Sequence, residues 1–289
     1  MKLHLLRLRL APAIVLLLLL PSGAATEQKP ASAAAQPPQA EAKVTAAAQP
    51  PQAEAKVSAA ARLEPRRANY AFPPQTLHYQ AEWHYMTAGV ATLQLERSGA
   101  QEHALGTADA TGVVALLYRV QDRFDAYFDP NSFCSYKLVK HTEEGLHRRD
   151  TTITYDYKQG KAVLEEKNLK NNQQKRTEND IPACVTDVVS GILYVASLPL
   201  QPGATYTFPL NDGGKTVNVQ AHVTGTEQVK TPAGNFNAVR VEPEGDAGVL
   251  KGRGRIWIWY TDDAQHLPVQ MRAKLYWGSL TVYLTSAAK

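Results

Sequence analysis

The sequence predicts a β-dominated α+β fold: a curled, mainly antiparallel, half-barrel-like sheet with one main helix. Apolar and polar residues alternate in many separate segments, which is the period-two pattern of half-buried strands. Only one longer segment, Val188–Ser197, has an apolar stripe with helical spacing. Because antiparallel sheets commonly keep one face in water, we expect the helix to fill the concave side of the sheet.

Residues 1–25 have the pattern of a secretory signal peptide. The segment Met1–Leu20 runs from a basic head into an apolar core that is too short to span a bilayer. Ser22 and Ala24 are small residues of the kind that a signal peptidase accepts. We therefore expect an exported protein, periplasmic or secreted, whose mature chain begins at Ala25 or Thr26.

Removal of this segment changes the charge balance. It takes away three of the 31 basic residues and none of the 27 acidic ones, so the mature chain is close to neutral. Nucleic-acid-binding proteins normally have a strong basic excess, so we expect no nucleic-acid partner. No later segment approaches about 18 consecutive apolar residues, so we expect no transmembrane segment in the mature chain.

Residues 26–74 are predicted to be a disordered linker. Ala, Pro, Gln, Glu and Lys dominate the segment, and too few large apolar side chains are present to offset chain entropy. Within it, Ala33–Thr45 is followed directly by Ala46–Ser58, a tandem repeat of 13 residues. The Pro-Pro pairs favour a plain extended spacer, and the alternative is a tether that spans the cell wall or binds a partner.

A single β-rich domain is predicted over residues 75–289. Its first strand alternates from Leu77 to Tyr85, with Tyr79 and Trp83 on the same side as these two, and a turn at Thr87–Gly89 leads into the second strand. The same alternation recurs at residues 91–96, 124–128, 153–157, 206–210, 217–223, 269–277 and 280–284.

Helical signals are few. Asp187 can cap the helix Val188–Ser197, and Leu198-Pro199 stops it. A shorter helical turn is expected at Val113–Tyr118, between two strands.

The chain contains no recognised catalytic motif, and we expect no catalytic residue, no metal site and no cofactor. Adjacent acids on a strand point to opposite faces, which disfavours acid–base pairs. These pairs are Glu143/Glu144, Glu165/Glu166 and Asp262/Asp263.

His78 and His84 lie on one strand face but too far apart to share a metal ion. His141 and His147 can approach each other across a hairpin, but without a third ligand they are a weak metal signal.

A cluster of basic residues surrounds Arg148 and Arg149. Its other members are Lys137, Lys140, Lys158, Lys161 and Lys167. We favour a solvated outer sheet face, where lysines oppose aggregation. The alternative is a surface that meets anionic lipid headgroups or acidic glycan.

Cys134 and Cys184 are the only cysteines of the chain. Two cysteines in an exported protein are candidates for a disulfide, here between a strand and the start of the helix. The alternative is two separately buried free thiols. Neither belongs to a Cys-x-x-Cys motif, which makes a redox enzyme improbable.

The order of several segments resembles the bacterial exported domain-of-unknown-function family 3108. The matching segments are Leu77–Tyr85, Gly89–Leu95, Tyr118–Phe124, Ile181-Pro182 with Asp187–Tyr194, Thr231–Phe236 and Trp259–Val269. The likeness spans about Thr76–Thr285. It implies no particular chemistry, because the family has no established activity. It implies a fold similar to the half-barrels of periplasmic lipoprotein carriers, in which a curved sheet faces a helix across an apolar cavity.

Six inward-facing aromatic residues are candidates to line such a cavity: Tyr79, Trp83, Phe124, Phe128, Tyr206 and Phe208. Alternatively, they form an ordinary core. The leading hypothesis is a non-enzymatic cell-envelope protein that binds a lipid or another apolar small molecule. The second is an assembly or scaffold protein that contacts other envelope proteins, for which the sequence names no partner. The third is a hydrolase of envelope glycan or lipid.

Overall fold

The computed structural model describes residues 63, 67, 70–245, 254–275 and 278–288. The predicted signal peptide, the tandem repeat and most of the predicted linker lie outside these residues. Within them, one antiparallel sheet has the strand order β8-β7-β6-β5-β4-β3-β2-β1-β14-β13-β12-β11-β10-β9. Strands that follow one another in the chain therefore pair, except β8 and β9, which are the two edges of the sheet, and β1 pairs with β14.

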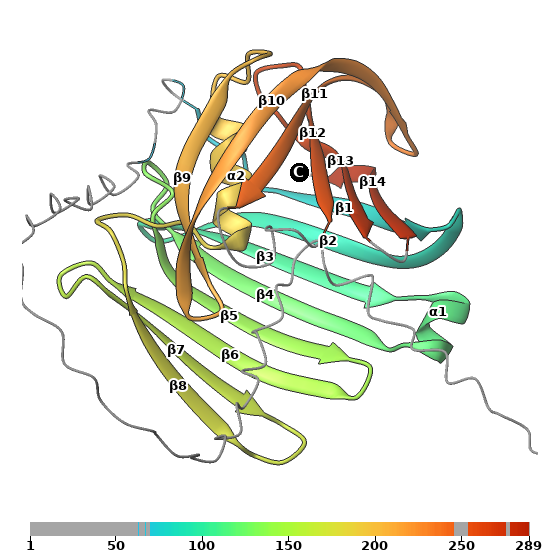
Figure 1. The fold of residues 1–289 in the computed structure, drawn as a ribbon. Coiled ribbons are helices and arrows are strands. Elements are labelled where there is room, and N and C mark those ends of the chain that lie inside the picture. Colours follow the sequence, from blue (N-terminus) through green and yellow to red (C-terminus); the bar gives the residue numbers. More distant parts are fainter. Residues whose placement is uncertain (1–62, 64–66, 68–69, 246–253, 276–277, 289) are drawn as a thin grey trace, which may run out of the picture.

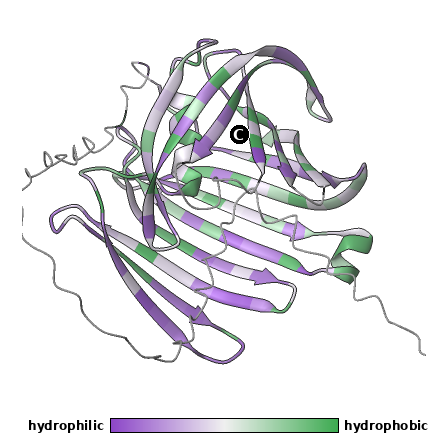
Figure 2. Cartoon of the chain, viewed as in Figure 1, coloured by the Kyte–Doolittle hydropathy of each residue, from purple (hydrophilic) through white to green (hydrophobic). Residues whose placement is uncertain are grey.

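The first half of the sheet comprises β1 (Gln75–Trp83), β2 (Met86–Ser98), β3 (Gln101–Ala110), β4 (Val120–Phe128), β5 (Ser135–Glu144), β6 (His147–Asp156), β7 (Lys161–Asn168) and β8 (Gln174–Asp180). The second half comprises β9 (Thr205–Asp212), β10 (Lys215–Thr231), β11 (Gly234–Gly245), β12 (Arg255–Thr261), β13 (Pro268–Leu275) and β14 (Gly278–Ala288). The helices are α1 (Gly112–Leu117) and α2 (Val188–Ser197). Hydropathy alternates along many of the strands, as expected where one face is apolar (Figure 2).

The sheet curls until its two ends approach each other (Figure 1). The tip of the β9–β10 hairpin lies against the first half of the sheet, where Lys140 of β5 forms an ion pair with Asp212 and Tyr155 of β6 donates a hydrogen bond to the Asn211 carbonyl. Asn179 of β8 also donates to the Thr216 hydroxyl of β10. The predicted half-barrel is confirmed.

Helix α2 has the predicted bounds and the predicted cap. The Asp187 carboxylate accepts hydrogen bonds from the backbone N–H groups of Val189 and Ser190. The expected single apolar stripe is wrong, because the helix is buried on almost every side and only Val188 and Ile192 are half-buried. A helix enclosed by a curled sheet must be apolar or hydrogen-bonded all round.

The first hairpin differs from the sequence prediction. β1 ends at Trp83, and the turn consists of His84 and Tyr85 rather than Thr87–Gly89. Tyr85 is fully exposed instead of facing inward. The alternation of β1 ends at Trp83, because His84 and Tyr85 have positive φ angles and form the turn. Trp83 stays on the inner face, because it pairs with the buried Leu280 of β14.

The barrel-like sheet has two dissimilar ends. At one end, called the α1 end, lie α1, the β1–β2 turn and the β5–β6 turn; at the other, the α2 end, lie the loops 129–134 and 262–267 and the entry to α2 (Figure 1). β1 starts at the α2 end, so the chain that precedes Gln75 joins the domain there.

The ordered domain begins before residue 75. Arg67 donates backbone and side-chain hydrogen bonds to carbonyl groups of Ser197 and Ala196 at the end of α2, and its guanidinium lies over the Tyr70 ring. Tyr70 is buried and donates a hydrogen bond to the Gln265 carbonyl. Tyr70 and Phe72, which lie within the predicted linker, therefore pack on the core.

Candidate functional site

The six aromatic candidates do not form one continuous wall. Phe128 of β4 and Phe208 of β9 are joined through Phe133 and Tyr194 of α2 in a chain of ring contacts with centroid separations of 5.1 to 6.0 Å. These rings belong to the hydrophobic core at the α2 end. This half of the interior is packed as an ordinary core, which was the alternative to a cavity in the sequence analysis.

The other candidates are spread over the inner face. Tyr79 is buried and donates a hydrogen bond to the Pro268 carbonyl, and Phe124 is fully buried in the middle of β4. Tyr206 is half-buried and its hydroxyl donates to the Pro199 carbonyl. Trp83 is half-buried near the α1 end. Whether any of them touches a ligand stays a proposal.

Polar and charged side chains occupy the inner face of the sheet toward the α1 end. Strand partners in an antiparallel pair share a face, so Phe124 places Lys140 on the inner side, and Lys140 places Thr151 there. The same pairing places Glu144 opposite the buried Val120. The interior is thus aromatic at the α2 end and charged at the α1 end.

Asp122 is the most unusual member of this polar inner face. It lies two residues before Phe124 on the same face of β4 and is 3% exposed. Its Oδ1 accepts a hydrogen bond from the Glu143 backbone N–H at 3.0 Å, and its Oδ2 has no hydrogen-bond partner among the described residues. Burial, with a smaller contribution from the negative charge of Glu144, raises the pKa of Asp122 to about 8.

The pKa values of two neighbouring side chains, Glu144 and Tyr118, are also raised. Burial raises the pKa of Glu144, while the positive charges of Arg149 and Lys140 oppose this effect. Burial also raises the pKa of the Tyr118 hydroxyl, and Glu144 and Asp122 add to it. Three titratable side chains at the α1 end therefore favour their neutral forms, which is characteristic of a site that excludes water.

The predicted basic cluster is divided between the two faces of the sheet. Lys140 is buried on the inner face, where its Nζ lies 2.5 Å from Asp212 Oδ1. Arg149 is also inward, 3.9 Å from Glu166. Arg148 is exposed and lies 3.8 Å from Glu143. The expected single solvated face is wrong, because successive residues of a strand point to opposite sides.

The histidine expectations have mixed outcomes. His84 is in a turn and not on the strand face of His78. The His141 ring lies 2.6 Å from the Asp150 carboxylate. His147 is the strand partner of Glu144, three register positions from the His141–Asp150 pair. No group of three or more potential metal ligands is present among the described residues.

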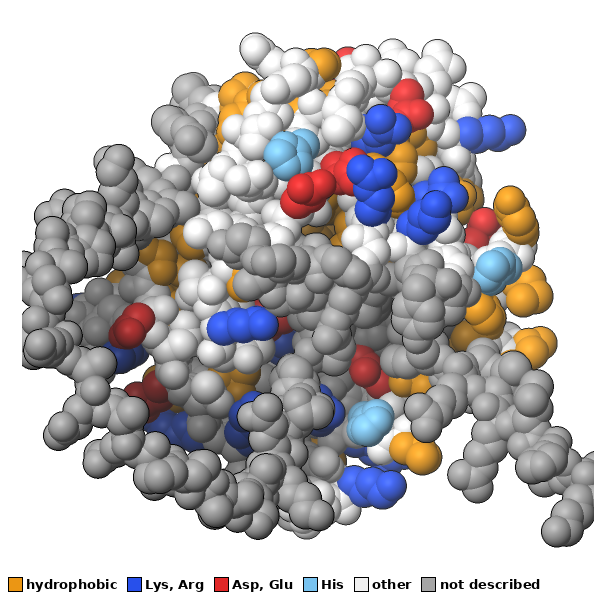
Figure 3. All heavy atoms as spheres, in the orientation of Figure 1, with side chains coloured by type: hydrophobic (Ala, Val, Ile, Leu, Met, Phe, Trp, Pro, Cys, Tyr) orange, Lys and Arg blue, Asp and Glu red, His pale blue; other side chains and the backbone are white. Residues whose placement is uncertain are grey.

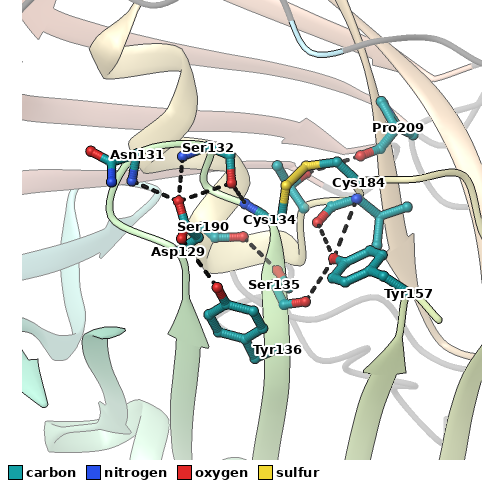
Figure 4. The surroundings of a disulfide bond; sticks show 12 residues. Asp129, Asn131, Ser132, Cys134, Ser135, Tyr136, Tyr157, Cys184, Ser190 and Pro209 are labelled. Carbon is teal, nitrogen blue, oxygen red and sulfur yellow. Dashed lines mark hydrogen bonds between the residues drawn. A yellow bond between two sulfur atoms is a disulfide. The ribbon is translucent and has the colours of Figure 1, made fainter. Parts of the chain in front are cut away.

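At the α2 end, a disulfide and a buried hydrogen-bond network fasten the helix to the sheet. Cys134 and Cys184 are bonded, with their Cα atoms 5.1 Å apart (Figure 4). One residue further along β5, the Ser135 hydroxyl donates to the Asp187 carboxylate at 2.6 Å. Tyr157 donates to the Ser135 carbonyl at 2.7 Å. This network explains why an acidic cap residue is tolerated in the core.

Sequence reasoning missed the polar inner face although a signal for it was present. In β4, Asp122 is in phase with Val120 and Phe124; in β5, Lys140 is in phase with Leu138. A charged residue at an inward position breaks the binary pattern, and such breaks concentrate at functional sites. The same reasoning also missed the exposed apolar residues at the α1 end, which are described below.

Within the described residues, no helix is both long and apolar enough to cross a membrane. A family model described as "Protein of unknown function (DUF3108)" matches residues 78–285. The chain is a member of the DUF3108 family. This confirms the resemblance stated from the sequence, and the match spans nearly the whole barrel-like domain of this DUF3108 protein. No curated protein matches it.

Three bacterial proteins of solved structure align with the DUF3108 domain. A β-barrel-like protein of domain family DUF1849 from Brucella abortus is 11% identical, with a TM-score of 0.53, covering 75% of this chain and 98% of its own. This likeness shows a shared barrel-like fold. A candidate exported protein with a YmcC-like fold from Bacteroides fragilis, 10% identical, covers 79% of this chain and 100% of its own with a TM-score of 0.35. A candidate lipoprotein from Parabacteroides distasonis, also 10% identical, covers 79% and 99% with a TM-score of 0.27.

Proposed function

We propose that this DUF3108 protein is an exported, non-enzymatic cell-envelope protein that binds an amphipathic, lipid-like ligand inside the curled sheet. The ligand enters from the α1 end, its apolar part lies toward Phe124 and Trp83, and its polar head lies among the inner charged side chains. The signal-peptide pattern of residues 1–25 supports export to the periplasm or beyond.

The observation that carries this proposal is the change of chemistry along the inner face. Ligand sites are mostly apolar with a few convergent polar groups, and the α1 half of the interior offers that combination. Asp122 presents a buried oxygen that has no hydrogen-bond partner in the described part of the chain, and the Arg149 side chain is 30% exposed and lies 3.9 Å from Glu166. A hydroxyl or ammonium group of the ligand can donate a hydrogen bond to the Asp122 oxygen, and an anionic headgroup can accept hydrogen bonds from the Arg149 guanidinium.

Native mass spectrometry of the protein purified from its own envelope fraction tests the proposal directly. We expect a bound species with the mass of a lipid, released on denaturation. Protein that is free of any bound species and that also fails to bind an apolar fluorescent probe contradicts the proposal.

A tryptophan pair provides the matched test by mutation. Trp83→Ala changes the inner face, whereas Trp257→Ala changes a half-buried tryptophan of the outer face that pairs with the exposed Arg272. We expect Trp83→Ala to weaken probe binding about tenfold and to cost less than the roughly 3–5 kcal/mol of a solid core site. Trp257→Ala should leave probe binding unchanged. A full core-sized loss of stability for Trp83→Ala, with no probe binding by the native protein, would instead indicate a filled interior.

A further inference from the structure

The described residues expose seven large hydrophobic side chains, and all of them lie at the α1 end. They form what we call the tip surface: Tyr85, Met86, Val90, Val113, Leu116, Leu117 and Leu146. Tyr85 is 100% exposed and Leu116 is 86% exposed. Single exposed apolar residues are ordinary on a protein surface, but their concentration at one end indicates an interaction site.

The tip surface is continuous across three chain segments. The Thr111 N–H at the start of α1 donates to the Ala88 carbonyl of β2, which ties α1 to the first hairpin. At the other end of α1, the Gly145 N–H donates to the Arg119 carbonyl, which places the β5–β6 turn, and therefore Leu146, beside it. Figure 2 shows α1 as a hydrophobic helix, and Figure 3 shows hydrophobic side chains gathered on the rim over α1 and the β1–β2 turn.

Helix α1 has no buried residue, which is unusual for a helix of a globular domain. Helices in soluble proteins are stabilised mainly by packing an apolar face on the core. A six-residue helix with the sequence GVVALL that leaves its leucines in solvent lacks this stabilisation. The apolar side chains of α1 are therefore removed from water only when another surface covers them.

The β1–β2 turn provides an independent observation. His84 and Tyr85 have φ angles of 47° and 66°, so both residues of this two-residue turn are in the left-handed region. The β9–β10 turn has the same signs of φ and uses Gly213 and Gly214. Left-handed backbone costs a non-glycine residue roughly 1–2 kcal/mol, and turns of this kind prefer Asn and Gly. A bulky, fully exposed tyrosine at this position lowers stability, and no packing contact offsets the loss. Such a residue is typical of a functional position.

Basic side chains surround the tip surface. Arg119 and Arg148 flank α1 and the β5–β6 turn, with 54% and 52% of their side chains exposed. Lys170 and Lys274 are exposed in or beside neighbouring turns at the same end. The acids of this end are partly neutralised, because Glu143 is paired with both arginines and burial raises the pKa of Asp109.

We propose that the tip surface docks on the surface of an anionic lipid bilayer, with its apolar side chains inserted at the headgroup level and its basic rim against the headgroups. Exposed leucine, valine and tyrosine side chains next to arginine and lysine are the combination by which proteins bind membrane interfaces. The interaction places the α1 end of the barrel against the membrane. The first strand then begins at the far, α2 end, where the chain preceding Gln75 joins the domain.

Vesicle flotation with the purified mature protein tests this docking. The probes are vesicles of phosphatidylethanolamine with phosphatidylglycerol, compared with vesicles of phosphatidylcholine alone. The tip variant is Tyr85→Asn/Leu116→Glu/Leu117→Glu, which changes only exposed side chains. We expect the native protein to float with the anionic vesicles, to bind them less at high salt, and to lose about tenfold or more of its partitioning in the tip variant.

The matched control adds the same charge at the opposite end. Gln159→Glu/Gln201→Glu changes two exposed residues of the α2 end and should bind vesicles like the native protein. Equal binding by the tip variant and the native protein overturns the proposal. The proposal is also overturned if the native protein binds neither kind of vesicle. If, in that case, a protein co-purifies with the native protein but not with the tip variant, the tip surface is a protein interface instead. A ligand inside the barrel does not affect this comparison, because the tip substitutions lie outside it.

Discussion

Asp122 is the residue whose environment departs furthest from its usual one. A carboxylate with a single backbone hydrogen bond, next to Phe124 on the inner face, is destabilised in its charged form. Burial raises its pKa to about 8, against about 4 for an exposed aspartate. Between these two pH values the folded protein holds a proton that the unfolded chain has released.

The first prediction follows from this linkage. The free energy of unfolding of the native protein should fall as the pH rises from about 4 to about 8, because the folded state binds more protons than the unfolded state in that interval. Asp122→Asn should make this decline smaller, with Glu144 and Asp109 still contributing, and should raise stability at pH 9 by about 1–3 kcal/mol. Urea midpoints at pH 5 and pH 9 measure the effect. Asp180→Asn, at an exposed carboxylate paired with Lys161, is the control that should keep the native pH profile.

The second prediction concerns the strained turn. His84→Asn/Tyr85→Gly should raise the free energy of unfolding by about 1 kcal/mol or more, because both substitutes adopt positive φ angles at lower cost. The reverse change, Gly213→Ala, should lower it by about 1 kcal/mol, since a Cβ there meets no neighbour and only the φ angle of 64° opposes it. Denaturant midpoints of both variants test the argument. A stabilising Gly213→Ala would count against it.

At the scale of elements, α2 is held by three kinds of attachment. The Asp187 cap orders its first turn, Tyr260 of β12 donates a hydrogen bond to the Ile192 carbonyl, and His266 lies 2.9 Å from the Ala196 carbonyl at its end. Burial lowers the pKa of His266. The disulfide joins the approach to β5 to the approach to the helix.

The third prediction tests the disulfide. Cys134→Ala/Cys184→Ala should lower the free energy of unfolding by roughly 4 kcal/mol, the loop-entropy value for a crosslink across a 50-residue separation. Reduction of the native protein should cause a similar loss. Denaturant unfolding with and without reductant measures both. If the double variant and the native protein unfold at the same midpoint under oxidising conditions, the crosslink adds no stability.

At the scale of the whole molecule, the chain combines a spacer that is predicted to be disordered with a barrel-like sheet. One end of this sheet is packed, and the other end is polar inside and has exposed apolar residues at its rim. The packed α2 end carries the attachment of Arg67 and Tyr70, so the spacer reaches the domain on the side away from the tip surface. This arrangement gives the α1 end freedom to approach a membrane or a ligand.

The fourth prediction separates the spacer from its docked end. Deletion of Ala33–Ser58 should leave the thermal midpoint unchanged, because this segment has almost no apolar surface to bury. Tyr70→Ala should lower the midpoint by several degrees, since it removes a buried ring and a hydrogen bond to Gln265. Thermal unfolding of the mature protein measures both. A lower midpoint for the deletion would show that the repeat packs on the domain.

Local patterns were sufficient to predict the fold class, the family and the helix α2 with its cap. Period-two alternation indicates one apolar face wherever a strand is regular. Asp187 followed by an apolar stripe indicates the start of a helix, whatever surrounds it in the fold. Where a strand ends earlier than its alternation suggests, as at Trp83, the pattern placed the turn residue Tyr85 on the wrong side. The end of a strand depends on its pairing with the neighbouring strand and is not encoded locally.

The sequence by itself determined that the chain folds as an antiparallel sheet with one long helix, because these properties arise from side-chain periods within single segments. Only the tertiary structure decided which face of each strand is enclosed, that the aromatic rings of Phe128 and Phe208 meet around α2, and that Asp122 and Lys140 point inward. It also decided that the hydrophobic residues of the first hairpin, helix α1 and the β5–β6 turn form one tip surface. These features depend on how the sheet curls, and curling brings together residues that no local pattern relates to one another.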